Sequence, residues 1–433
     1  MINRPIAIDL FAGAGGMSLG FEQAGFDVVA AVEVDPIHCA VHKFNFPECA
    51  IVPQSVVGLT AAQIRLAAGI GNKPIDCVFG GPPCQGFSLI GKRAFEDPRN
   101  TLVSEFVRLV GELQSRTFVF ENVKGLTVGK HKQFLKELVQ EFEEINYQVR
   151  LKWEVLSAAK FGVPQKRERL ILIGSKVGEP LPSYPVPKSL PVPTTFEALS
   201  DLPNADEFPI LANTDSVRTK KFGTPSKYAA ELRCQTDNCW HHGYVRSWDP
   251  SILTSSARTE HTEISKRRFA NTLPGTVEPI SRFFKLPPDG QSNTLRAGTD
   301  GTRGAFTSPR PIHFKYNRCV TVREMARLHG FPDWFRFHRT KWHGARQIGN
   351  SVPPPLARAV AEEVIKALGE KPGFPHRTMQ LGEESLLEME LRKAANYFGV
   401  EAPTSRRDKK SGAKKRKQEE VEADLLAKKA ANA

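Results

Sequence analysis

The amino-acid sequence predicts an α/β fold built on a mostly parallel sheet, followed by a smaller irregular region. In the first third of the chain, short β-branched runs alternate with helical segments, and a glycine-rich turn joins the first run to a helix. This alternation is typical of βαβ units on a parallel sheet. From about residue 176 the sequence becomes proline-dense and then polar and irregular, which indicates a domain boundary.

The expected elements follow one another in a regular order. The strand-like run in "IAIDLFAGAGG" leads into the glycine turn, and Met17, Phe21 and Ala24 then recur at helical spacing. Four further strands are expected in "DVVAAVEVD", "IDCVFGG", "RTFVFENV" and "RLILIG". Helical order returns with "VTVREMARLHGF" and with "SVPPPLARAVAEEVIKALGE", an amphipathic helix that should end near Gly369.

Composition and charge narrow the class of protein. The chain has 433 residues, enough for two domains and a tail, and its net charge of +13 favours a polyanionic partner, nucleic acid above all, over charge that serves solubility alone. Its seven scattered cysteines argue for reduced thiols rather than a disulfide framework. With no leader-like start and no 18-residue apolar run, we expect a soluble, cytoplasmic protein without a membrane partner.

The glycine turn and an acidic residue after the next strand suggest a nucleotide-like ligand. Backbone N–H groups of the turn and the helix that follows can approach such a ligand closely, and Glu33 can accept hydrogen bonds from both hydroxyls of a ribose. A tight β–α turn beside a surface glutamate is an equal alternative. Gly13, Gly15 and Gly16 do not match G-x-G-x-x-G, since position 18 is serine, which speaks against a nicotinamide enzyme.

Cys84 lies in the loop "GGPPCQGFS", where two prolines restrict the backbone before it. Most cysteines are buried and inert, and Cys77 in the apolar run "IDCVF" fits that description. The polar, glycine-flanked loop around Cys84 instead favours a nucleophile, because a thiolate needs access and a polarising environment.

Three charged residues are predicted to lie at the same side of the sheet as this thiol. Glu121 ends one expected strand, and Arg167 and Arg169 open another, two positions apart and therefore on one face of it. A solvated strand edge is the alternative for the arginines. A thiol, a carboxyl and a guanidinium pair that converge on one edge of a sheet indicate a catalytic site.

The ordered motifs of residues 6 to about 368 resemble the bacterial-type DNA (cytosine-5)-methyltransferases of type II restriction-modification systems. The matching stretches are "DLFAGAGG", "EVD", "GPPCQGFS", "ENV", "QKRER", "RCVTVREMARLHGFPD" and "QIGNSVPPPLA". The resemblance implies a Rossmann-like methyltransferase domain that uses S-adenosylmethionine to methylate carbon 5 of a cytosine flipped out of double-stranded DNA. It also implies a monomer, which is either the modification partner of a restriction endonuclease with which it forms no stable complex or an orphan methyltransferase without such an endonuclease.

The resemblance divides the chain into four expected parts. Residues 1–176 would form the catalytic domain, 177–317 the target-recognition domain, 318–368 a segment returning to the catalytic domain, and 369–433 a C-terminal helix and a basic tail. The tail from residue 404 holds ten Lys or Arg and five Asp or Glu residues, so the positive excess is not confined to it.

The resemblance also assigns catalytic roles. Cys84 would add to carbon 6 of cytosine, and Glu121 would stabilise the charge that develops toward N3, which requires a raised proton affinity. Arg169 would hold the carbonyl oxygen of the base, and Arg167 would organise the site or bind a phosphate.

Nine cofactor-binding residues carry over from the matching motifs. They are Phe11, Gly13, Gly15, Glu33, Val34, Ser55, Pro82, Asn350 and Val352. Two of them depart from the family pattern: Val34 stands where an aromatic residue is usual, and Ser55 where an aspartate usually reads the adenine. Since a neutral acceptor binds more weakly than a carboxylate, these two residues put the affinity for the cofactor in question.

The DNA-binding residues are the least determined by sequence. Gln85 and Ser88 are expected in a loop that closes over the flipped base. Arginines in polar loops of the recognition region could contact bases or phosphates, although surface solvation is the safer interpretation for each alone; they are Arg258, Arg267, Arg268, Arg296 and Arg303. No metal is expected, because "CQTDNCWHH" has poor spacing for zinc.

Two rival functions remain open at this point. An RNA methyltransferase could share the fold, although the recognition region of this chain is long for a tRNA-directed relative. A DNA-binding regulator without catalytic activity is the other alternative, but a binding protein has no use for the thiol of Cys84.

Overall fold

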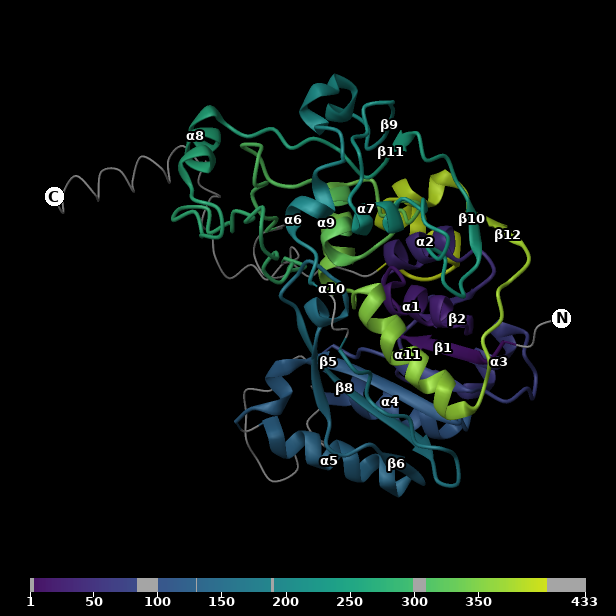
Figure 1. The fold of residues 1–433 in the computed structure, drawn as a ribbon. Coiled ribbons are helices and arrows are strands. Elements are labelled where there is room, and N and C mark those ends of the chain that lie inside the picture. Colours follow the sequence, from purple (N-terminus) through teal and green to yellow (C-terminus); the bar gives the residue numbers. More distant parts are fainter. Residues whose placement is uncertain (1–3, 84–99, 130, 188–190, 299–308, 403–433) are drawn as a thin grey trace, which may run out of the picture. The chain divides into compact units, whose positions relative to one another are not determined.

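An eight-stranded sheet forms the centre of the fold (Figure 1). The structure, a computed structural model, describes residues 4–83, 100–129, 131–187, 191–298 and 309–402. Along the sheet the strand order is β3-β2-β1-β4-β5-β8-β6, and β7 also pairs with β8. The strands are β1 (Ile6–Leu10), β2 (Asp27–Val32), β3 (Ala50–Val52), β4 (Cys77–Gly80), β5 (Thr117–Val123), β6 (Tyr147–Val149), β7 (Glu154–Ser157) and β8 (Glu168–Lys176).

Seven strands of this sheet run in one direction, and β8 alone runs in the opposite one. All pairings from β3 to β5 are parallel, whereas β8 runs antiparallel to β5, β6 and β7. The predicted mixed, mostly parallel α/β sheet is therefore confirmed, including each strand expected from the sequence. From the boundary between β1 and β4 the chain proceeds outward in two directions: β2 and β3 follow on one side of β1, and β5 follows on the other side of β4. The carboxyl ends of β1, β2, β4 and β5 lie at one edge of the sheet, where open α/β sheets bind ligands at such a boundary.

Helices cover both faces of the sheet, and the side-chain alternation of β1 shows how. Ile8 and Leu10 lie in a core with α3, α4 and α5, while Ala7 lies in the opposite core with α1 and α11. The helices of these layers are α1 (Gly16–Ala24), α2 (Pro36–Asn45), α3 (Ala61–Ala68), α4 (Thr101–Leu113), α5 (His131–Glu144) and α11 (Pro354–Leu368). The last of these ends at Gly369, as the sequence predicts.

Helix α11 packs directly on α1, although the two helices are more than three hundred residues apart in the sequence. A Cβ atom on Gly20 of α1 would come within 2.5 Å of the Cβ of Ala357 in α11, so only glycine allows the two helices to pack this closely. The glycine turn at the start of α1 is thereby fixed against the C-terminal part of the catalytic motifs.

Residues 177–317 contain short elements and much irregular chain, as expected. Most of their buried apolar side chains, including Leu199, Leu211 and Leu295, lie in a core that they share with Met325 of α9 and Ile348 of α10. The helices and strands here are α6 (Thr195–Leu199), β9 (Val217–Arg218), α7 (Lys227–Leu232), β10 (Val245–Ser247), β11 (Ile252–Leu253) and α8 (Glu263–Asn271). Helices α9 (Val322–His329) and α10 (Lys341–Asn350) follow this region in the chain. The four-part domain division itself stays a prediction.

Five 3-10 helices complete the elements in the described part of the chain. They are η3 (Lys124–Thr127), η4 (Ala158–Phe161), η5 (Ala205–Glu207), η6 (Pro209–Ala212) and η8 (Glu384–Glu388). Within the described part of the chain, no helix is both long and apolar enough to span a membrane.

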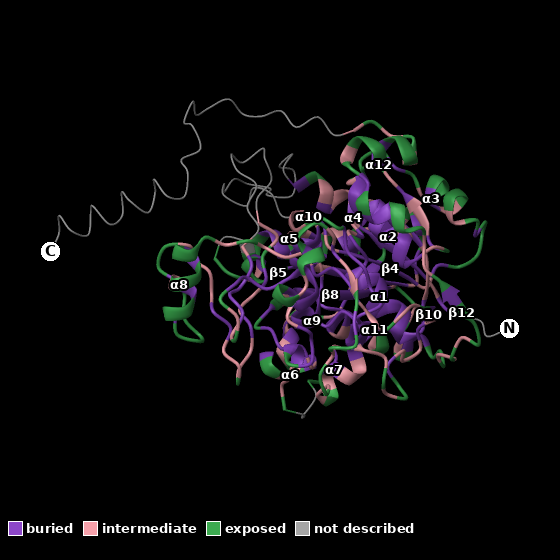
Figure 2. Ribbon diagram, turned by 90° about the horizontal axis from the view of Figure 1, so that it is seen from above, coloured by how far each residue is buried: buried purple, intermediate pink, exposed green. Residues whose placement is uncertain are grey.

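The segment after α11 packs on the molecule, which the sequence analysis did not anticipate. Strand β12 (Thr378–Gln380) pairs with β10, and η8 and α12 (Leu391–Phe398) cover α2. Leu386 and Leu387 are buried there against Phe44. Figure 2 shows α12 with an exposed outer side, above the buried α2.

We expect Leu387→Ala to lower the free energy of unfolding by about 2–5 kcal/mol, because it opens a cavity in the core between η8 and α2. Leu66→Ala is the matched control, since Leu66 is 83% exposed on α3 and its loss should change the stability little. Urea unfolding followed by fluorescence measures both variants. Equal stability of the two variants would show that the C-terminal segment does not pack as described.

Candidate active site

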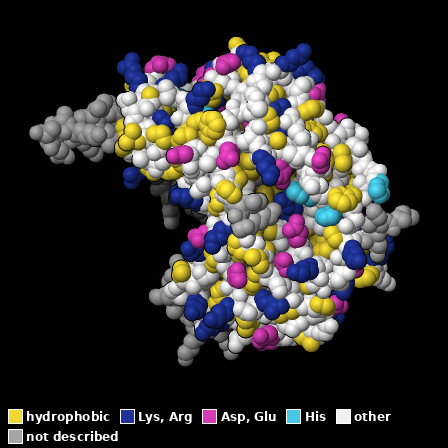
Figure 3. Space-filling view, in the orientation of Figure 1, with side chains coloured by type: hydrophobic (Ala, Val, Ile, Leu, Met, Phe, Trp, Pro, Cys, Tyr) yellow, Lys and Arg dark blue, Asp and Glu magenta, His cyan; other side chains and the backbone are white. Residues whose placement is uncertain are grey.

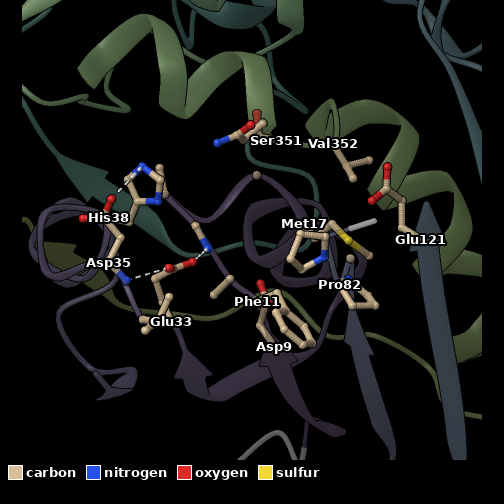
Figure 4. A pocket seen from close by; sticks show the side chains of 18 of the residues that line it. Asp9, Phe11, Met17, Glu33, Asp35, His38, Pro82, Glu121, Ser351 and Val352 are labelled. Carbon is tan, nitrogen blue, oxygen red and sulfur yellow. Dashed lines mark hydrogen bonds and ion pairs between the residues drawn. The ribbon is translucent and has the colours of Figure 1, made fainter. Parts of the chain in front are cut away.

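A cavity of about 570 Å³ lies at the carboxyl ends of β1, β2, β4 and β5. Its wall is completed by Arg169 at the start of β8, by the last turn of α10, and by Ser351 and Val352, which follow that helix. Figure 4 shows Glu33, Asp35 and His38 at one end, Met17, Pro82 and Glu121 at the other, and Ser351 and Val352 on the opposite side from Phe11. Eight of the nine predicted cofactor residues line the cavity: Phe11, Gly13, Glu33, Val34, Ser55, Pro82, Asn350 and Val352.

Gly15 is the ninth, and the structure places it outside the lining. It caps the N-terminus of α1 with a φ of 99°, and a Cβ atom there would overlap the ring of Phe46. Its conformation and its close contact both demand glycine. Gly13 differs, since a Cβ atom there would meet nothing within 4 Å, so its open side belongs to the cavity.

The carboxylate of Glu33 is held by two backbone N–H groups. Its Oε2 accepts a hydrogen bond of 2.8 Å from Gly13, and its Oε1 accepts one of 2.8 Å from Asp35 (Figure 4). Each oxygen keeps a further lone pair for a ligand. The glycine turn and the end of β2 are thus locked together around one carboxylate at the cavity wall.

Asp9 is a lining residue that the sequence analysis did not assign to the site. Its side chain is 1% exposed, Ser18 donates a hydrogen bond of 2.5 Å to it, and burial raises its pKa to about 8. Its position points to the site even in the sequence, because Asp9 is an acidic residue near the end of the strand that precedes the glycine turn. At neutral pH the cavity floor therefore carries a largely uncharged carboxyl group.

Val34 and Ser55, the two departures from the family pattern, lie at the outer rim. Val34 is 58% exposed although it lines the cavity. The hydroxyl oxygen of Ser55 accepts a hydrogen bond of 3.1 Å from the N–H of Val57, which closes a local turn. This end of the cavity is therefore open to solvent and lined without a charge at either position.

Glu121 and Arg169 form an ion pair in the cavity wall. The antiparallel register pairs Val123 with Arg169, so Glu121 and Arg169 are diagonal neighbours on one face, with Nε and Oε1 2.7 Å apart. Their side chains are only 12% and 13% exposed. Burial raises the pKa of Glu121 above its ordinary value, with the charges of Arg169 and Arg167 opposing the rise.

Arg167 lies beside this pair but is 1% exposed, and its partners are backbone carbonyls. Nη1 donates to Leu295 at 3.1 Å, and Nη2 donates to Gly349 at 3.0 Å and to Ser351 at 2.7 Å. Of the two roles expected for this residue, the geometry fits organisation of the site and leaves no surface for a phosphate.

Cys84, Gln85, Ser88 and Arg303 lie outside the described residues. The chain that leads to Cys84 is described: Gly81, Pro82 and Pro83 all line the cavity. Asn122 donates a hydrogen bond of 3.1 Å from Nδ2 to the carbonyl of Pro82, which fixes this segment against β5.

The remaining predicted DNA-binding arginines have different surroundings. Arg267 and Arg296 are exposed, Arg268 lies 3.7 Å from Glu278, and Arg258 lines a second cavity together with Asp206. On the face seen in Figure 3, Lys and Arg side chains are spread among acidic ones rather than gathered in one patch. In the described ranges, no three or more His, Cys, Asp and Glu side chains lie together in a way that could hold a metal ion, and His241 pairs with Glu231 at 3.1 Å.

The strand order and the cavity define an α/β protein with a nucleotide-type site at the strand ends, and the comparisons define it further. The family model of the C-5 cytosine-specific DNA methylases matches residues 6–366. The type II methyltransferase M.XorII of Xanthomonas oryzae pv. oryzae is 59% identical over 399 residues, which is 92% of this chain and 93% of that protein. M1.HphI of Haemophilus parahaemolyticus, also a type II methyltransferase, is 35% identical over 83% of this chain and 86% of its own.

A solved structure extends this similarity to the fold. The candidate DNA modification methyltransferase encoded within an E. coli prophage superimposes with a TM-score of 0.70 at 34% identity, over 84% of this chain and 100% of that one. The chain belongs to the C-5 cytosine-specific DNA methylase family and is a DNA (cytosine-5)-methyltransferase.

We expect Gly81→Ala to reduce the turnover number at least tenfold while the protein still folds. A Cβ atom on Gly81 would overlap Oε2 of Glu121, and the flexible carboxylate can move aside only by leaving its place in the cavity wall. Gly125→Ala is the matched control, because its Cβ would meet only Val123 at 3.9 Å. Methyl transfer and circular dichroism are measured for both variants, and wild-type turnover in Gly81→Ala would show that the position of this carboxylate is unimportant.

Proposed function

We propose that this chain is a type II modification methyltransferase that flips a target cytosine out of double-stranded DNA and methylates it at carbon 5 through a covalent Cys84 adduct. The observation that carries the proposal is the buried Glu121–Arg169 pair in the wall of a cavity that also receives the segment leading to Cys84. In the host, this activity would protect DNA from a cognate restriction endonuclease, the role suggested by the type II relatives.

The described residues fit S-adenosylmethionine as cofactor. The cavity volume of about 570 Å³ lies in the range typical of cofactor sites. Glu33 offers a backbone-held carboxylate for the ribose hydroxyls, the open side of Gly13 leaves room for the methionine part, and Val34 and Ser55 face the adenine end. When bound, the cofactor supplies an electrophilic methyl group on a sulfonium.

Carbon 5 of cytosine is a weak nucleophile, so the ring needs activation before it can accept a methyl group. The thiolate of Cys84 forms a bond to carbon 6, and the electrons of the C5=C6 double bond become available at carbon 5. Negative charge that moves toward N3 is neutralised by the proton of Glu121. After methyl transfer to carbon 5, a base removes the proton from carbon 5, the bond to Cys84 breaks and the C5=C6 double bond re-forms, and N3 returns its proton to Glu121.

The raised pKa of Glu121 determines how this step depends on pH. A carboxyl group whose pKa is raised stays protonated to a higher pH, so the proton donor persists toward neutrality and is lost as the pH rises through that pKa. Arg169 contacts Glu121 directly and presents its remaining N–H groups to the carbonyl oxygen of the base. Arg167 acts from behind, by holding the segments around the pair.

Methyl transfer from labelled S-adenosylmethionine to unmethylated genomic DNA tests the proposal, with total tRNA as the parallel substrate and bisulfite sequencing of the DNA product. Label in DNA, with 5-methylcytosine at one recurrent short sequence, is the expected result. Label in tRNA alone would favour an RNA methyltransferase, and label in neither would favour a DNA-binding protein without activity.

We expect Cys84→Ser to abolish turnover while S-adenosylmethionine still binds, because a serine hydroxyl has no accessible anion at neutral pH. Cys77→Ala is the matched control, since Cys77 is fully buried within β4 and its thiol should play no part in turnover. Turnover is measured by label transfer and binding by calorimetry. Full activity of the serine variant would contradict the thiol-addition mechanism.

We expect Ser55→Asp to bind S-adenosylmethionine about fivefold more tightly, as a charged acceptor forms stronger hydrogen bonds than a hydroxyl. One carboxylate oxygen can still accept from Val57, which leaves the other for the adenine. Gln54→Glu adds the same charge at the neighbouring lining position and controls for general attraction of a cation. Equal affinities of wild type and Ser55→Asp by calorimetry would mean that the adenine is held by other groups.

A further inference from the structure

We propose that Gln165 and His329 are positioning residues that couple DNA binding to cofactor binding, by joining a segment of the recognition region, Ser292–Leu295, to the cavity-closing turn Gly349–Ser351. The inference rests on the proposed function, since it assumes that the cavity takes S-adenosylmethionine. Neither side chain lines the cavity, and both are fully buried beside Arg167.

Every polar atom of the Gln165 side chain has a partner. Oε1 accepts a hydrogen bond of 3.0 Å from the N–H of Leu295, and Nε2 donates to the carbonyl of Leu328 at 3.2 Å and lies 2.9 Å from Nδ1 of His329. An amide with both ends engaged has one orientation only, so a shift of Leu295 is passed on to His329.

The contacts of His329 determine its tautomer. Nε2 lies 3.0 Å from the carbonyl of Ser351, which can only accept, so Nε2 carries the hydrogen. Burial and the charge of Arg167 keep the pKa of His329 well below its ordinary value, so the ring is neutral and Nδ1 accepts from Gln165. The ring therefore forms a directional link from Gln165 to Ser351.

Arg167 joins the same two segments by a second route. Its guanidinium donates to Leu295 and to both Gly349 and Ser351, so the carbonyl of Ser351 accepts from Arg167 and His329 together. The recognition segment and the cavity-closing turn are thus joined by two routes, one through Gln165 and His329 and one through Arg167, and Arg167 lies beside the Glu121–Arg169 pair.

Close backbone contacts also connect the 292–297 segment to the start of β8 and to Gly349. Lys166 donates to the carbonyl of Ser292 at 2.8 Å, and Ser292 donates to the carbonyl of Pro164 at 2.9 Å. A Cβ atom on Gly349 would overlap the backbone nitrogen of Ala297. A displacement of the 292–297 segment on DNA binding is therefore transmitted to the turn that carries Asn350 and Val352, two lining residues.

A coupling role and a purely structural role predict different results. Coupling means that DNA tightens the binding of the cofactor product, S-adenosylhomocysteine, by a factor that a broken link reduces toward one. A purely structural role lowers the melting temperature but leaves that factor unchanged.

The test measures the affinity for S-adenosylhomocysteine by calorimetry, with and without PCR-copied, unmethylated genomic DNA, for the full chain and its variants. His329→Phe keeps the ring shape and loses both links. His329→Asn can keep an acceptor for Gln165 but loses the donor to Ser351. His329→Gln can keep a donor to Ser351 but loses the acceptor for Gln165. Phe142→Leu, in the remote core of α5, controls for lost stability.

We expect the coupling factor to fall about tenfold in His329→Phe, the effect of a buried hydrogen bond lost from one state only, and to stay at the wild-type value in Phe142→Leu. Each single-link variant should also lose coupling, since the chain of contacts needs both links. If His329→Phe does not fold, Gln165→Met makes the same test.

Three outcomes would overturn the inference: a coupling factor of one in the wild type, an unchanged factor in all variants that break a link, or an equal loss in Phe142→Leu. Failure of the proposed function is a separate result: a protein without methyltransferase activity would bind no S-adenosylhomocysteine, and an RNA methyltransferase would bind it but transfer label to tRNA and not to DNA.

Discussion

The burial of one guanidinium group organises the centre of this enzyme. Arg167 is 1% exposed, and a charge removed from water must be compensated by well-placed acceptors. Its Nη1 and Nη2 donate to the carbonyls of Leu295, Gly349 and Ser351, which lie more than a hundred residues away along the chain. Folding cannot bury Arg167 without bringing the recognition region and the cavity-closing turn to the start of β8.

The neighbouring ion pair follows from that arrangement. With Arg167 held by backbone oxygens, Arg169, two residues on, faces the same way and reaches Glu121. Two cations near one carboxyl would normally lower its pKa, yet burial outweighs them and the pKa rises. The wall of the cavity thereby keeps a carboxyl group that can hold a proton beside a guanidinium that can donate hydrogen bonds.

The sequence predicts the parts of this structure that depend on local pattern and fails where contacts are distant. The strands, the glycine turn and α11 follow from periodicity and glycine placement. The link between Gln165 and His329 joins residues 164 positions apart, and the packing of Leu387 on α2 comes from a segment with no strong pattern. Arginines mislead for the same reason: Arg323 and Arg327 are buried and bind carboxylates or carbonyls, so residue type alone does not identify DNA contacts.

The two ends of the cavity differ in rigidity, and this difference has a chemical consequence. At the inner end, Glu33 is locked by two backbone N–H groups and Asp9 is buried, so groups there are positioned before any ligand arrives. At the rim, Val34 is largely exposed and Ser55 offers only a hydroxyl that a local turn already uses. A preorganised acceptor costs little to use, whereas an exposed rim contributes less to binding. Selectivity for the ligand should therefore reside in the part that meets Glu33, and changes at the rim should alter the affinity modestly without changing which molecule is recognised.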